Sequence, residues 1–158
     1  MTTPASATSV TTSTEVNAPV ERAFKVFTEE MESWWNPDHH ILEAKLERMV
    51  TEPKVGGRIY DIGVDGSECQ WARVLAYEPP HRFVFSWDIS LEWKIEADPA
   101  RTSEVEVTFA ATDRGTTIVT LTHRHLDRHG EGWEGMAGAV GSEGGWPSGL
   151  HRFAECLA

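Results

Sequence analysis

The spacing of apolar residues changes once within the first 35 positions of the chain. Residues 9–17 alternate and are rich in β-branched side chains, which predicts a strand. Residues 18–35 instead repeat at three or four positions, which predicts a helix of about four turns with one apolar face. Pro19 suits its first turn, and Asn-Pro-Asp at 36–38 ends it. The face consists of Val20, Phe24, Phe27, Met31 and Trp34.

From residue 43 onward the apolar period is two. Turn signals such as Asp65-Gly66 separate six strand candidates, at 43–53, 57–64, 68–80, 81–90, 103–112 and 116–126. This alternation is typical of an antiparallel sheet with one solvated face. Three sets of residues each share a face: Phe83, Phe85 and Trp87; Val105, Val107 and Phe109; and Val119, Leu121 and His123.

The strand candidate at 68–80 has an ambiguous orientation. Trp71, Arg73 and Leu75 form one alternating set, and Ala72, Val74 and Ala76 form the other. Both sets suit a sheet, so the pattern leaves open whether Trp71 points inward.

Helical spacing returns after His125. A short helix weakened by glycines is predicted over 130–140, and a last helix over 146–158 has Pro147 in its first turn. The glycines at 141–145 lack the Lys and Ser/Thr of a phosphate loop and are predicted to form a turn. The element order predicts an α+β domain over residues 8–158, in which a curved antiparallel sheet of six to seven strands wraps around a long C-terminal helix. Residues 1–7 are predicted to be a disordered tail.

Seven tryptophans in 158 residues are the most informative feature of the composition. They come from the end of the first helix, from the strand region and from the C-terminal segment, so they could converge on one pocket for an apolar or aromatic ligand. The alternative is that the rings simply pack the core.

The charge pattern excludes several classes of partner. The net charge is −11 without any basic run, so neither nucleic acid nor an anionic membrane surface is expected to bind. The apolar runs are too short to cross a membrane, and the first ten residues lack the features of a secretory signal. We therefore expect a cytoplasmic protein in which Cys69 and Cys156 are free thiols, although the sequence does not exclude a disulfide or a homodimer.

The histidine-rich segment 123–129 is the main candidate for polar chemistry. It resembles the metal-binding pattern HxHxDH, but Arg128 separates Asp127 from the last histidine. We expect no metal there. His123 continues the inward face of Val119 and Leu121, so we expect it to point into the cavity with a pKa near neutrality. The pair His39-His40 is expected to be exposed, with the alternative that one of the two lies at the cavity mouth.

From Val16 onward the chain resembles the START-related, helix-grip superfamily called SRPBCC. Within that superfamily it is most similar to the domain named after the activator of the heat-shock protein 90 ATPase. The resemblance rests on "VNAPVERAFKVFT" at 16–28, on the segments 56–87 and 103–130, and on "GGWP" at 144–147. It implies a deep cavity between the C-terminal helix and the sheet. Members of the superfamily bind lipids, steroids or hormones, or cyclise polyketides, so the fold does not define the function.

Three functions follow as hypotheses. The first is a cofactor-free binding protein for a small hydrophobic or aromatic molecule, with His123 as polar anchor and a wall formed by Trp71, Phe85, Trp87, Phe109, Leu121 and Trp146. The second is a cyclase or hydrolase that uses His123 as general acid and base, although no nucleophile motif requires an enzyme. The third is a partner of the chaperone. The eukaryotic activators carry an additional N-terminal docking domain for which this chain has no room, so we do not expect that role.

Overall fold

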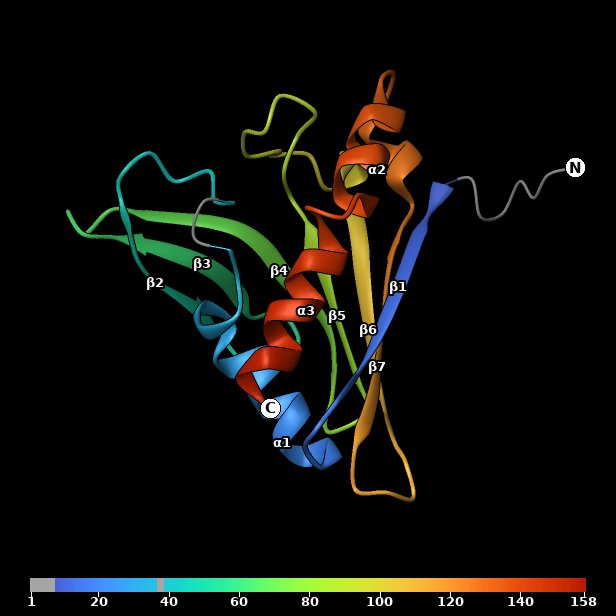
Figure 1. Cartoon of the computed structure of the whole chain (residues 1–158). Coiled ribbons are helices and arrows are strands. Elements are labelled where there is room, and N and C mark those ends of the chain that lie inside the picture. The colour runs from blue at the N-terminus through green and yellow to red at the C-terminus, as the bar shows by residue number, and fades with distance from the viewer. Residues whose placement is uncertain (1–7, 37–38) are drawn as a thin grey trace, which may run out of the picture.

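The computed structural model describes residues 8–36 and 39–158 (Figure 1), so the predicted tail at 1–7 lies outside the described residues. Within these ranges seven antiparallel strands form one sheet in the order β1-β7-β6-β5-β4-β3-β2. The strands are β1 (Val10–Val16), β2 (Leu46–Thr51), β3 (Arg58–Gly63), β4 (Glu68–Glu78), β5 (Arg82–Trp87), β6 (Ser103–Ala111) and β7 (Thr117–Arg124).

The helices lie mainly at the two ends of the chain, as predicted. They are α1 (Val20–Glu29), α2 (Trp133–Gly141) and α3 (Trp146–Cys156), with short 3-10 turns η2 (Met31–Ser33), η3 (Pro99–Arg101) and η4 (Leu126–His129). Figure 1 shows α3 lying across the curved sheet, with α1 beside its C-terminal end. Phe27 of α1 and Phe153 of α3 pack edge to face, with ring centroids 5.2 Å apart. The predicted α+β helix-grip fold is confirmed, but its C-terminal helix is divided into α2 and α3 by a turn.

The first helix is shorter than predicted. It ends at Glu29 because Glu30 leaves the helical region, with φ −125° and ψ 42°, and a 3-10 turn follows. The end of a helix leaves backbone carbonyls without partners. The indole Nε1 of Trp34 donates to one of them, the carbonyl oxygen of Phe27, at 3.3 Å. The predicted apolar face, including Met31 and Trp34 beyond the helix, is nevertheless buried throughout.

The two faces of the sheet follow the predicted alternation in β6 and β7. In β6 the apolar set is buried, whereas Glu104 and Glu106 lie on the outer face and form ion pairs with Arg124 of β7. Central strand β5 differs, because every residue from Phe83 to Trp87 is buried.

A bulge in β4 resolves the orientation that the sequence left open. Ile59 of β3 pairs with Ala72 and Tyr60 pairs with Gln70, so that Trp71 is the extra residue between them. Such a bulge redirects side chains locally. Trp71 and Ala72 are consequently both buried, and neither of the two simple alternations holds.

Two further observations concern membrane-spanning helices and the cysteines. No helix within the described residues is long and apolar enough to span a membrane. Cys69 and Cys156 are free, as predicted.

Candidate ligand-binding site

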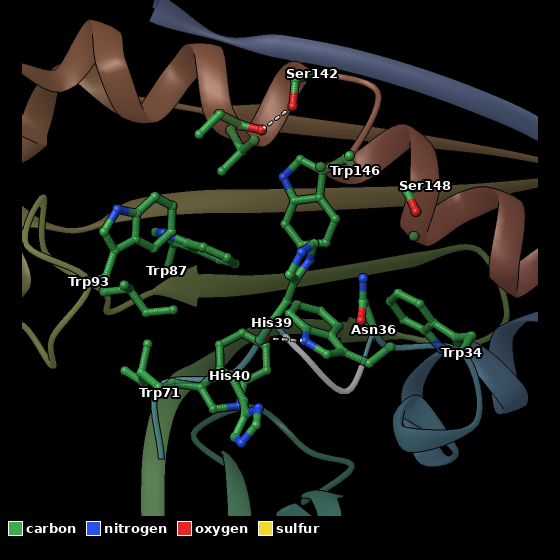
Figure 2. A pocket seen from close by; sticks show the side chains of 18 of the residues that line it. Trp34, Asn36, His39, His40, Trp71, Trp87, Trp93, Ser142, Trp146 and Ser148 are labelled. Atoms are coloured by element: carbon green, nitrogen blue, oxygen red, sulfur yellow. Dashed lines mark hydrogen bonds between the residues drawn. The ribbon is translucent and has the colours of Figure 1, made fainter. Parts of the chain in front are cut away.

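A pocket of about 550 Å³ lies between the end of the sheet, the α2–α3 turn and the segment that follows η2. Six of the seven tryptophans line it, and we call it the tryptophan pocket. Figure 2 shows them entering from opposite sides, Trp146 from the helical side and Trp71 from the strands. The six are Trp34, Trp35, Trp71, Trp87, Trp93 and Trp146. The seventh, Trp133, packs at the edge of the core.

Local backbone features direct several of these rings into the pocket. The β4 bulge redirects Trp71. Trp34 and Trp35 follow directly after η2, the 3-10 turn at the end of α1. Trp93 takes the left-handed conformation, with φ 61°, which is uncommon for a residue that is not glycine. Trp146 is the first residue of α3.

The rings contact one another around the pocket. Trp35 lies between Trp71 and Trp146, with centroid distances of 5.0 and 5.6 Å. Trp87 is 5.9 Å from Trp71 and 5.5 Å from Trp146. Tilted and edge-to-face pairs at these distances are mutually stabilising. The wall is therefore a set of rings held in fixed orientations.

A buried hydrogen-bond network outside the pocket lining holds Trp146 in place. Its indole Nε1 donates to Nδ1 of His123 at 3.0 Å. Nε2 of His123 is 2.7 Å from the hydroxyl of Ser103, which lies 2.7 Å from Nε2 of His129. Ser103, His123 and His129 are all buried. The network connects α3 to β6, β7 and η4.

The expectation of a near-neutral pKa for His123 is wrong. Burial, with a smaller contribution from the nearby His129, lowers the pKa of His123 to about 3. The imidazole is inaccessible to solvent, and Ser103 and Trp146 occupy both of its nitrogens. His123 is therefore a neutral structural group, and sequence alternation did not reveal how deeply the helices bury it.

Asp61 is the buried carboxylic acid of the pocket wall. It lies in β3 on the inward face with Ile59 and Gly63, and its exposed fraction is 2%. Oδ1 accepts a hydrogen bond from Nε1 of Trp71 at 3.1 Å. Burial raises the pKa of Asp61 to about 6, although the bond from Trp71 and the charge of His40 act in the opposite direction. A carboxyl group in this range can both accept and release a proton near neutral pH.

Trp87, whose side chain lines the pocket, has a hydrogen-bond donor that lacks a partner. Its Nε1 is buried and has no hydrogen-bond acceptor among the described residues. Such a group costs free energy unless it is satisfied. Because this nitrogen is covered by its neighbours, an acceptor atom on a bound molecule would reach it only after a movement of the Trp87 ring.

The structure divides the seven predicted binding residues, six for the wall and His123 as anchor, into two groups. Trp71, Trp87 and Trp146 line the pocket. Phe85 lies behind them, with its ring 6.0 Å from that of Trp71 and 6.4 Å from that of Trp146. The other three are fully buried beyond the lining: Phe109, which packs on α1, Leu121 and His123.

Sequence reasoning left Asp61 out of the site. The signal was an acidic side chain in phase with Ile59 on an alternating strand, which places a carboxylate on the buried face. His39 is exposed as expected, but His39 and His40 both line the pocket, whereas the alternative placed only one of them at the cavity mouth. At the sequence level we expected no metal at residues 123–129. In the structure, Nε2 of His123 and Nε2 of His129 each form a hydrogen bond with the hydroxyl of Ser103.

Comparisons with known proteins place this pocket in context. Residues 17–158 match the family model described as Activator of Hsp90 ATPase homolog 1-like protein. No curated protein sequence matches the chain.

Solved structures provide matches over nearly the whole chain. An anthrahydroquino-gamma-pyrone synthase, Txn09, complexed with SUM, is 38% identical with a TM-score of 0.66, covering 94% of this chain and 96% of Txn09. The self-sacrificing resistance protein CalC from Micromonospora echinospora is 28% identical with a TM-score of 0.68, covering 95% and 94%. Protein NE0264 from Nitrosomonas europaea is 16% identical with a TM-score of 0.70, covering 99% and 97%, and supports the fold alone.

Proposed function

Because this chain belongs to the Activator of Hsp90 ATPase homolog 1-like family and carries a pocket walled by tryptophans, we propose that it binds a fused-ring aromatic ketone there. The convergence of six indole rings from separate elements carries this proposal. Flat, apolar and rigid walls suit a flat, apolar ligand. The pocket volume of about 550 Å³ lies within the range of small-molecule sites.

The ketone part of the proposal rests on the polar groups of the wall. The N–H of Trp87 has no acceptor, and a ring movement that exposed it to the pocket would let a ligand carbonyl oxygen supply one. Asp61 adds a carboxyl group on the strand side, of which only Oδ1 accepts a bond from Trp71. A ligand that offers only hydrocarbon would add no hydrogen bond to either group.

The similarity to Txn09 supports the same ligand class. That protein is a synthase of an anthrahydroquino-gamma-pyrone and is 38% identical over almost the full length of both chains. The match also favours a second candidate function, a cofactor-free synthase or cyclase that acts on such a molecule. Binding is common to both functions and is tested first.

The test is a fluorescence titration with 1,8-dihydroxyanthraquinone, a three-ring ketone, with palmitate as a non-aromatic comparison. We expect saturable quenching of tryptophan emission by the anthraquinone and a weaker response to palmitate. Trp87→Phe should weaken binding, because it removes the unpaired donor and part of the wall. Trp133→Phe is the matched control outside the pocket lining, and it should bind as the unaltered protein does. Absence of quenching, or equal weakening in both variants, would contradict the proposal.

A further inference from the structure

We infer that Asp61 is the general base of the tryptophan pocket, taking a proton from a carbon next to the carbonyl group of the bound molecule. This inference rests on the proposed function, because it requires an aromatic ketone in the pocket. It goes further in two respects. It assigns proton transfer to one side chain, and it narrows the ligand class to enolisable ketones.

The position of Asp61 favours this role over that of any other ionisable group nearby. Among the described residues, the ionisable side chains in the wall are His39, His40 and Asp61. His39 is exposed and His40 is partly exposed, whereas Asp61 is buried. A base shielded from water interacts more strongly with a reacting group than one in solvent. His123 lies outside the lining with both nitrogens bound.

The hydrogen bond from Trp71 orients the carboxyl group. The indole N–H holds Oδ1 at 3.1 Å, and the Trp71 ring itself lines the pocket. The bulge in β4 thus positions both the ring that would contact the ligand and the donor that holds the base. Because Oδ1 is engaged, we assign proton transfer to Oδ2.

The electrostatic surroundings of Asp61 support a base at neutral pH. Its pKa of about 6 results mainly from burial. The charge of His40 lowers this pKa, and the thiol of Cys69, the cross-strand neighbour in β4, interacts with the Asp61 charge. On the other side β2 places the uncharged Met49 opposite Asp61. Asp61 is therefore mainly a carboxylate at pH 7 and a stronger base than an ordinary exposed carboxylate.

The proposed step needs no further reactant. A C–H bond next to the ligand carbonyl breaks, its proton forms an O–H bond with Oδ2 of Asp61, and its electron pair moves to the carbonyl oxygen as an enolate. The N–H of Trp87 is covered and unpaired, and a movement of its ring toward the pocket would present a donor to that oxygen. The neutral Asp61 exchanges this proton with solvent water and then returns a proton to carbon, which restores both the ketone and the carboxylate.

Deuterium exchange into 2-tetralone tests this step directly. This two-ring aromatic ketone has enolisable C–H bonds, and their exchange in D₂O can be followed by proton NMR. We expect the unaltered protein to accelerate exchange over buffer by roughly 100-fold, the ordinary scale of general-base catalysis. Asp61→Asn should return the rate to that of buffer, because the amide cannot take the proton while its oxygen can still accept the Trp71 bond. Asp113→Asn, at an exposed carboxylate, is the matched control and should exchange as the unaltered protein does.

The unaltered protein also provides a test that requires no variant. After subtraction of the buffer rate, catalysed exchange should rise with pH and level off above about 6, following ionisation of Asp61. If 2-tetralone quenches the tryptophans but exchange is not accelerated, or is equally fast in Asp61→Asn, the inference is overturned and the binding function stands. If neither 2-tetralone nor 1,8-dihydroxyanthraquinone quenches, the proposed function and this inference are both overturned.

Discussion

Trp146 donates its indole N–H to Nδ1 of His123 at 3.0 Å, and this bond determines which nitrogen of the histidine carries the proton. An indole N–H can only donate, so Nδ1 must be the accepting, unprotonated nitrogen. A neutral His123 then carries its proton on Nε2 and donates to Ser103, which in turn donates to Nε2 of His129. A neutral His129 consequently holds its proton on Nδ1, a buried atom without a partner among the described residues.

Replacing His123 should destabilise the protein while leaving the ionisable groups of the pocket in place. His123→Leu removes the acceptor for Trp146 and the donor to Ser103, both of which remain buried. We expect a loss of about 2 kcal/mol in the free energy of unfolding, measured by urea denaturation, because unsatisfied buried polar groups are costly. His151→Leu is the control, since the side chain of His151 is 74% exposed and should matter little. An unchanged urea midpoint for His123→Leu would contradict the role of the network.

Asp61→Asn should stabilise the protein at pH 7 and not at pH 4. The folded pKa of about 6 lies above the ordinary value of 3.8, so the folded state favours the protonated carboxyl. Ionisation of Asp61 therefore costs stability as the pH rises from about 4 to about 6, by about 3 kcal/mol in all. Asparagine avoids this cost, so the variant should exceed the unaltered protein in unfolding free energy at pH 7, with the difference nearly gone at pH 4. A constant difference at both pH values would show that ionisation is not its cause.

The same pair of proteins should differ in acid sensitivity. The pKa of His123 is lowered from 6.5 to about 3, so the unfolded state binds its proton first and stability falls as the pH drops below 6.5. Asp61 acts in the opposite direction between pH 6 and pH 4. The unaltered protein should therefore lose stability gradually in this window, and Asp61→Asn should lose it more steeply, as measured by thermal melts at half-unit steps. If the melting temperatures of the two proteins fall equally with pH, the opposing effects of Asp61 and His123 on stability are contradicted.

The turn between α2 and α3 should tolerate alanine at one glycine and not at its neighbour. A Cβ atom on Gly145 would overlap the carbonyl oxygen of Val140, which is backbone and cannot move aside without distorting α2. A Cβ atom on Gly144 would meet nothing within 4 Å. We expect Gly145→Ala to lower the melting temperature by several degrees and to weaken anthraquinone binding through displacement of Trp146. Gly144→Ala should match the unaltered protein, and equal behaviour of the two variants would refute the steric argument.

The fold was largely predictable because its strands and first helix bury one regular face each. The alternation in β6 and the inward face of α1 are properties of single segments, and both are confirmed. The early end of α1 at Glu29 and the bulge at Trp71 depend on partners elsewhere: a tryptophan seven residues after Phe27 and the register of β3. The predicted family is also confirmed by the match over residues 17–158.

The site was less predictable because it depends on how deeply each side chain is buried. Inward orientation was correctly assigned to His123, yet this residue lies behind the wall with its pKa far below neutrality. Asp61 shares the inward orientation, on the same face of β3 as Ile59 and Gly63, but lines the pocket. Alternation distinguishes the two faces of a strand but does not reveal whether helices, a pocket or solvent lies beyond the face.

The pairing of β1 with β7 has a consequence for how the molecule is made. Val10 lies opposite His123, so β1 must wait until all the other strands have left the ribosome before its partner is complete. Pairing over such separations is slow compared with local helix formation. The pocket closes later still, because Gly145 and Gly149 of its lining follow β7 in the chain. A nascent chain halted just before Gly145 would expose the indole rings of the strand side to water, so synthesis of the α2–α3 turn and of α3 converts an exposed apolar surface into a binding site.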